Sequence, residues 1–205
     1  MNRTVIATAI LLGATSLSMG AFAQATTNPA PAGMQGTLDR DVHQQQRIEN
    51  GLQNGTITTR EGAELERDEA RVDRMQSRDM RNGSLSSAEQ AQLNRAQDRV
   101  SRDIHQATTN GVNGNPMSAS SQRMQADVQR NINQQDRIAD GVHNGSLTAH
   151  EASRMEGGEA RVDQREYAAG QNGRVSAREQ TGIQREDNRQ SQRIYNQKHD
   201  KQHRH

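Results

Sequence analysis

The chain has 205 residues, with 26 basic and 25 acidic side chains, and it contains neither cysteine nor tryptophan. The lack of cysteine excludes a disulfide scaffold, a thiol nucleophile and a cysteine-ligated metal site. Apolar residues make up only 30% of the chain and aromatic residues 1%, which is too little for a large core around an enclosed catalytic pocket and indicates a thin helical or a disordered protein.

The first 23 residues have the pattern of a secretory signal peptide. Arg3 gives a positive start, residues 5–12 form an apolar run, and residues 21–23 (Ala-Phe-Ala) have the small-x-small form that signal peptidase accepts. The apolar run is too short to span a bilayer. We therefore predict cleavage after Ala23, a mature chain that starts at Gln24 in the periplasm or outside the cell, and no membrane span in the mature form.

An internal duplication organises the rest of the chain. A shift of 90 aligns residues 34–105 with residues 124–195 without a gap, and 27 of the 72 aligned positions are identical. Proline and glycine mark the segments around the two copies. We expect a disordered leader at 24–33, a first helical repeat at 34–105, a flexible linker at 106–120, a second helical repeat at 121–197 and a His-rich tail at 198–205.

One short pattern occurs four times and predicts where helices end and begin. It reads Asn-Gly, any residue, an aliphatic residue, Thr or Ser, two residues and Glu, and it starts at Asn54, Asn82, Asn144 and Asn172. Asn and Gly tolerate the left-handed backbone that closes a helix. Thr or Ser followed three residues later by Glu forms a capping box at the start of the next helix. These corners predict an all-α fold of two tandem three-helix units, arranged as helical hairpins or a loose bundle. The expected helices are 35–53, 58–81, 86–105, 122–143, 148–171 and 176–197.

Apolar residues at steps of three and four give the helices an inward face, but a sparse one. On the first helix this seam runs from Met34 to Leu52, and Gln45 interrupts it at the same place as Gln135 in the second copy. We interpret this polar residue as one that sets the register of the helix. The second copy also has glycines at 157, 158, 170 and 182, and we expect it to be the looser copy because glycine weakens a helix interior.

The corners share the Gly, aliphatic and Glu spacing of an EF-hand calcium loop. The first and third loop positions, however, include Leu52, Arg78 and Met80, which offer no side-chain oxygen to a hard cation. Only the loop from Asp140 to Glu151 comes near the required ligand set. Capping explains the pattern, so we expect calcium to be irrelevant to the fold.

The seven histidines support an alternative in which the protein binds a metal. His199 and His203 are four residues apart, so a continuing helix places them on one face, and His205 is close by. Imidazoles at this spacing hold copper, nickel or zinc. His143 and His150 flank one corner but have no counterparts in the first copy, which argues against a duplicated histidine site.

The longest identical segment of the two copies is Glu-Ala-Arg-Val-Asp, at 69–73 and 159–163. We interpret it as a solvated helix face with ion pairs, each contributing a few tenths of a kcal/mol. A face that binds a partner is the alternative. No arrangement of nucleophile and base emerges from the pattern, so we predict no enzyme, no catalytic residues and no cofactor.

Three features resemble those of a group of small exported proteobacterial proteins of unknown function: residues 44–48 (Gln-Gln-Gln-Arg-Ile), the four corners, and the ending Ile-Tyr-Asn-Gln-Lys-His at 194–199. Residues 147–151 (Leu-Thr-Ala-His-Glu) are also similar to the Leu-Thr-x-x-Gln motif that begins a helix in periplasmic chaperones of the Spy and CpxP type. These resemblances imply an envelope location and a helical fold, with no established activity.

We therefore expect an exported, non-enzymatic binding or structural protein of the bacterial envelope, with a role in stress tolerance. Its expected partners are proteins, including copies of itself. Nucleic acid is not expected, because basic and acidic residues are balanced. The alternative function is a periplasmic protein that binds copper, nickel or zinc through His199, His203 and His205.

Overall fold

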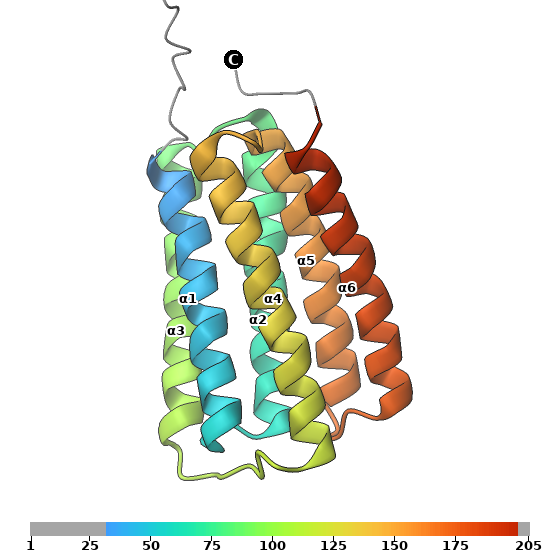
Figure 1. Cartoon of the computed structure of the whole chain (residues 1–205). Helices are drawn as coiled ribbons and strands as arrows, with labels where there is room; N and C mark the ends of the chain where they lie inside the picture. The colour runs from blue at the N-terminus through green and yellow to red at the C-terminus, as the bar shows by residue number, and fades with distance from the viewer. Residues whose placement is uncertain (1–31, 201–205) are drawn as a thin grey trace, which may run out of the picture.

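The computed structural model describes residues 32–200, which form six α-helices and no strand (Figure 1). The all-α prediction is therefore confirmed, and each expected helix corresponds to an observed one. The signal segment, most of the leader and the last five residues lie outside the described residues. The helices are α1 Ala32–Asn54, α2 Thr59–Asp79, α3 Ser87–Thr109, α4 Ala119–Asn144, α5 Ala149–Gly170 and α6 Ala177–Lys198, and a turn of 3-10 helix at Met80–Asn82 follows α2.

The four predicted corners are present, and the glycines and capping residues of the sequence pattern form them. Their glycines have left-handed backbone, with φ between 79° and 91°. Helices α2, α3, α5 and α6 each begin with a complete capping box. At α2, for example, the Thr58 N–H donates to Glu61 Oε2 at 2.9 Å and the Glu61 N–H donates to Thr58 Oγ1 at 3.2 Å. Sequence-local hydrogen bonds thus fix the start of every helix that follows a corner.

The two copies pack against each other as one bundle. Helices α2 and α5 run antiparallel through its centre, and α1 and α4 form a second antiparallel pair beside them (Figure 1). Helix α3 covers α1 and α2, and α6 covers α4 and α5. Two apolar clusters each join residues of both copies; one of them includes Ile48, Val72, Val162 and Ile183. The copies therefore share a core across the α2–α5 contact.

The connection between the copies is fastened to the bundle. Helix α3 extends to Thr109, so the chain between the helices is limited to 110–118. Within it, Asn110 Nδ2 donates to Glu61 Oε1 at 2.7 Å, and the Gly114 N–H donates to the Gly55 carbonyl at 2.8 Å. These bonds hold the connection against the corner between α1 and α2.

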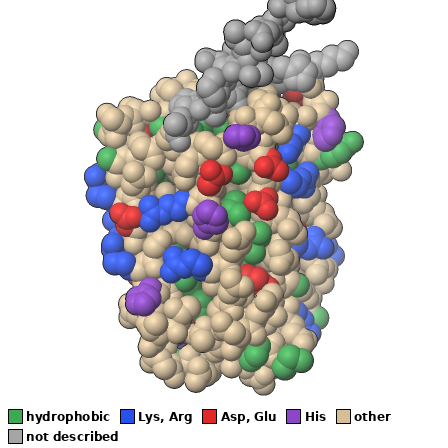
Figure 2. Space-filling view, turned by 60° about the vertical axis from the view of Figure 1, so that its left-hand side comes forward, with side chains coloured by type: hydrophobic (Ala, Val, Ile, Leu, Met, Phe, Trp, Pro, Cys, Tyr) green, Lys and Arg blue, Asp and Glu red, His purple; other side chains and the backbone are tan. Residues whose placement is uncertain are grey.

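The surface is polar and of mixed charge. On the side of the bundle where α1 and α3 lie, basic, acidic and histidine side chains are dispersed and hydrophobic ones form only small separate areas (Figure 2). Among the described residues, the large hydrophobic side chains that are exposed are Val112, Met117 and Tyr195. In the same part of the chain, no helix combines the length and the apolar character needed to cross a bilayer.

Candidate metal centre

The centre of the bundle contains acidic side chains where a helical core normally has apolar ones. Eight of them meet between α1, α2 and α5, each at most 2% exposed. We call them the central carboxyl cluster. They are Asp41, Glu66, Glu69, Asp73, Glu156, Glu159, Asp163 and Glu166.

Helical spacing explains why these acids lie together. The acids of the cluster are at positions 66, 69 and 73 of α2 and at positions 156, 159, 163 and 166 of α5. Steps of three and four place side chains on one face of a helix. Because α2 and α5 pack against each other through these faces, all seven acids are enclosed in their interface.

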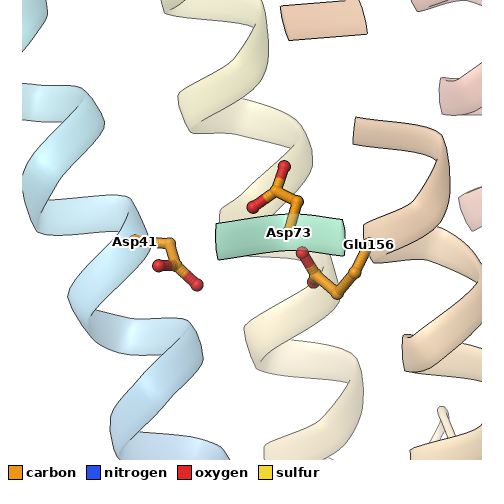
Figure 3. Close-up of side chains that lie close together, drawn as sticks. All are labelled: Asp41, Asp73 and Glu156. Carbon is orange, nitrogen blue, oxygen red and sulfur yellow. The ribbon is translucent and has the colours of Figure 1, made fainter. Parts of the chain in front are cut away.

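Three carboxylates from three helices converge at one end of the cluster. Asp41 of α1, Asp73 of α2 and Glu156 of α5 each place one oxygen within 4.8 Å of the others' (Figure 3). We call this set the first triad. Figure 3 shows the three side chains reaching toward one another from their separate helices.

A second triad lies further along the same interface. Glu66 of α2 and the α5 residues Asp163 and Glu166 also each offer one oxygen within 4.8 Å of the others'. Helix α4 contributes the amide of Asn131, whose Nδ2 donates to Glu166 Oε2 at 2.8 Å and to Asp163 Oδ1 at 3.3 Å. Each half of the bundle thus contributes residues to both triads.

Amide side chains are the hydrogen-bond donors to the cluster. Gln97 Nε2 donates to Asp41 Oδ1 at 2.6 Å, and the Gln76 amide also donates to Asp41. Gln190 Nε2 donates to Glu159 Oε1 at 2.9 Å. An amide satisfies one carboxylate oxygen but brings no positive charge, so these bonds leave the negative charge of the cluster unneutralised.

Arginines whose charge reaches the cluster, such as Arg40 and Arg47, are partly or fully exposed and are not buried with it. Between residues 33 and 200, no Lys, Arg or His is buried. The ion pairs lie at the surface, such as Arg40 with Asp98 at 2.5 Å. Among the same residues, no hydrogen-bond donor reaches the buried oxygens Asp73 Oδ2, Asp163 Oδ2 and Glu166 Oε1. A buried carboxylate without a partner costs several kcal/mol, so it takes up either a proton or a cation.

Burial raises the pKa values throughout the cluster. It raises the pKa of Asp41 and of Glu66 to about 7 and that of Glu159 to about 8. For Asp73, burial and then the nearby Glu156 and Asp41 carboxylates raise the pKa well above its ordinary value. Without a cation, the folded protein therefore holds protons in its core at neutral pH.

The structure describes only part of the predicted histidine site. His199 caps the C-terminus of α6, where its Nδ1 lies 2.7 Å from the Tyr195 carbonyl and its ring stacks on that of Tyr195 with 4.1 Å between the centroids. His203 and His205 lie outside the described residues. The described histidines are all exposed, and neither triad includes one.

The corner that comes nearest to an EF-hand uses its glutamate for capping. Glu151 Oε2 accepts hydrogen bonds from the Thr148 N–H and Oγ1, both at 2.8 Å. Asp140 lies on the exposed side of α4. The central carboxyl cluster does not include Glu151 or Asp140.

The interpretation of the shared segments 69–73 and 159–163 as solvated faces was wrong. Glu69 and Asp73 are buried, and only Arg71 points to solvent, where it pairs with Asp68. The signal that identifies the site is the recurrence of acids at steps of three and four, repeated 90 residues later. That spacing places the acids on one helix face and leaves open whether this face is exposed or buried.

No family model, no curated protein and no solved structure matches this chain. The functional conclusion therefore rests on the central carboxyl cluster. Opposite ligands of a cation with metal–oxygen distances of about 2.1–2.4 Å are about 4.2–4.8 Å apart. The oxygen separations within each triad are compatible with such a coordination sphere.

Proposed function

We propose that this chain is an exported, non-enzymatic metal-binding protein of the bacterial envelope that holds a hard divalent cation in the core of its helical bundle. The first triad carries the proposal: Asp41, Asp73 and Glu156 bring three buried carboxylates from three helices within 4.8 Å. The signal pattern at 1–23 and the resemblance to exported proteobacterial proteins support the location.

A cation converts the repulsion within the cluster into attraction. Three carboxylates in a medium of low dielectric repel strongly when all are charged. A divalent ion between them neutralises two charges and gives the unpaired oxygen Asp73 Oδ2 a partner. Because the ligands come from α1, α2 and α5, binding couples directly to folding.

The donor set selects the class of metal. Carboxylate and amide oxygens suit magnesium, calcium and manganese, whereas copper, nickel and zinc prefer imidazole or thiolate ligands. The core proposal and the histidine alternative therefore predict different metals as well as different residues. The expectation that calcium is irrelevant to the fold was based on the ligands of the corner loops, and the proposed oxygen-rich core site departs from it.

The test loads the protein by refolding, because every ligand of the cluster is buried. The metal-free chain is refolded from urea at pH 7.5 with magnesium, calcium, manganese, copper or zinc, and the free ions are then removed. Bound metal is measured by mass spectrometry and stability by thermal melting. We expect a hard cation to be retained and to raise Tm, and the Asp73→Asn/Asp163→Asn double variant to lose both effects.

Two controls make the result specific. The Asp136→Asn/Asp140→Asn variant removes the same charge from the exposed side of α4 and should bind as the wild type does. Replacing His199, His203 and His205 by alanine should also leave hard-cation binding intact. Retention of only copper or zinc, lost in the histidine variant, supports the alternative. No retained metal under any condition contradicts both.

A further inference from the structure

Each triad has three carboxylates, of which two occupy matching positions of the repeat and one does not. In the alignment of the copies, Asp41 corresponds to Asn131, and Gln76 corresponds to Glu166. The position that changes from acid to amide is thus accompanied by one that changes from amide to acid. Both substituted residues lie at their triad, because the Gln76 amide donates to Asp41 and the Asn131 amide donates to Glu166. Each triad consequently has three carboxylates, and the amide exchanged between the copies, Gln76 or Asn131, is among the amides that donate to it.

The antiparallel packing of α2 and α5 separates the triads along the bundle. Asp73 faces Glu156 in the first triad, and Glu66 faces Asp163 in the second. On α2, Glu69 lies one turn from Glu66 and one turn from Asp73. On α5, Glu159 has the same position between Glu156 and Asp163. Glu69 and Glu159 therefore occupy the level between the two triads.

We propose that the bundle binds two hard divalent cations, one in each triad, with Glu69 and Glu159 as ligands between them. This inference rests on the proposed metal-binding function and specifies its site. It also gives the internal duplication a chemical role, because each triad contains ligands from both copies.

Unpaired oxygens are present in both triads and not in one alone. In the first, no donor among residues 32–200 reaches Asp73 Oδ2 or Gln76 Oε1. In the second, the same holds for Asp163 Oδ2, Glu166 Oε1 and the amide oxygen of Asn131. All five side chains are nine-tenths buried or more. Buried acceptors without donors occur in other parts of the core as well, and those of each triad are the ones that converge within reach of a single cation.

The Asn131 amide occupies the point where the second triad converges. Its Nδ2 donates to Glu66 at 3.5 Å, to Asp163 at 3.3 Å and to Glu166 at 2.8 Å. The two ends of an amide group are nearly equal in size, so half a turn about its terminal bond exchanges Nδ2 for Oδ1. With a cation bound, that turn directs Oδ1 into the triad as a ligand. The turn breaks no hydrogen bond of Oδ1, because Oδ1 has no donor among the described residues.

The charge of one divalent cation is too small to neutralise the carboxylates of both triads. A divalent ion in the first triad leaves three carboxylates of the second without compensation, in an interface with no buried basic residue between 33 and 200. Glu69 lies one helical turn from Glu66 of the second triad and one turn from Asp73 of the first. It is therefore placed to share its charge between two ions.

Manganese tests the stoichiometry, because Mn²⁺ is counted by mass spectrometry and its paramagnetic resonance reports a neighbouring ion. After refolding and removal of free ions, we expect two manganese ions per wild-type chain, with a spectrum broadened by their coupling. Asp73→Asn and Asp163→Asn, at corresponding positions of the copies, should each retain one ion with a resolved, uncoupled signal. Far-UV circular dichroism at pH 5 checks that each variant folds.

A compensation experiment separates ligation from structure. Asp41→Asn alone should reduce the content to one ion, and Asp41→Asn/Gln76→Glu, which gives the first triad the composition of the second, should restore two. No restoration in a folded double variant overturns the inference. One ion in the wild type, lost in both Asp73→Asn and Asp163→Asn, also overturns it but leaves the proposed metal-binding function standing. No bound ion in the wild type contradicts both.

Discussion

Gln45 and Gln135 show how a polar residue in an apolar seam is used in this bundle. Gln45 Nε2 donates to Glu66 Oε2 at 2.9 Å, and Gln135 Nε2 donates to Glu156 Oε2 at 3.3 Å. The sequence predicts that these residues set the helix register, and the structure gives each a carboxylate of the cluster as its partner. Their positions in α1 and α4 match 90 residues apart because the acids that they contact also match.

The capping box at the start of α2 leads to a prediction about the stability that Thr58 and Glu61 contribute. Replacing Thr58 and Glu61 by alanine removes the reciprocal bonds at the start of α2 and should lower the free energy of unfolding by about 1 kcal/mol, with Thr58 carrying most of the loss. Urea denaturation measures it. Arg74→Ala, on the exposed side of the same helix, is the control and should change little. An unchanged midpoint in the double variant would show that the cap is dispensable.

At the scale of helices, the glycines of the second copy have opposite roles. A Cβ at Gly170 would lie 2.6 Å from Met124 Cε and 2.7 Å from Ala63 Cβ, so the end of α5 contacts α2 and α4 without room for a side chain. A Cβ at Gly182 would meet nothing within 4 Å. Only Gly182 is the simple helix-weakening glycine that the sequence predicts.

The same substitution should therefore act in opposite directions at these two sites. Gly170→Ala should destabilise the protein by roughly 1–3 kcal/mol, because the helices have to move apart. Gly182→Ala should stabilise it by up to ~1 kcal/mol, because alanine has the higher helix propensity. Thermal melts of both variants at one pH provide the comparison. If both substitutions stabilise the protein, the close contact at Gly170 is not a constraint.

The helices could be predicted from the sequence, but the site could not be recognised. Capping boxes and left-handed glycines act between neighbouring residues, so Thr58 with Glu61 identifies a helix start without knowledge of the rest of the fold. Whether Asp73 faces water or a core depends on which helix packs against it. That partner is α5, whose first acid in the cluster, Glu156, is 83 residues further along the chain. No local sequence pattern predicts that two acidic helix faces pack against each other, because like charges repel when no counter-ion lies between them.

For the whole molecule, the shared core changes how the protein should unfold. The sequence alone predicts that residues 124–195 lose amide protection before residues 34–105, because of the added glycines. The contact between α2 and α5 joins the copies instead, so we expect these two central helices to exchange together. The outer helices α3 and α6 should exchange earlier. Hydrogen exchange with mass spectrometry measures this order, and protection that divides the chain at 110–118 would contradict a shared core.

The central carboxyl cluster also predicts how stability depends on pH. Burial raises the folded-state pKa of Asp41 and Glu66 to about 7 and that of Glu159 to about 8, whereas carboxyls in an unfolded chain titrate at about 4. Between these values the folded protein binds more protons than the unfolded chain, so the free energy of unfolding falls as the pH rises. One such carboxyl alone loses ~2–3 kcal/mol over this range, so the metal-free protein should melt at least ~5–10 °C lower at pH 8 than at pH 5. Manganese should recover most of this loss at pH 8 and have little effect at pH 5, where protons occupy the carboxyls. A Tm that stays level or rises from pH 5 to pH 8 without metal would mean that these acids remain charged in the folded core and that another interaction stabilises them.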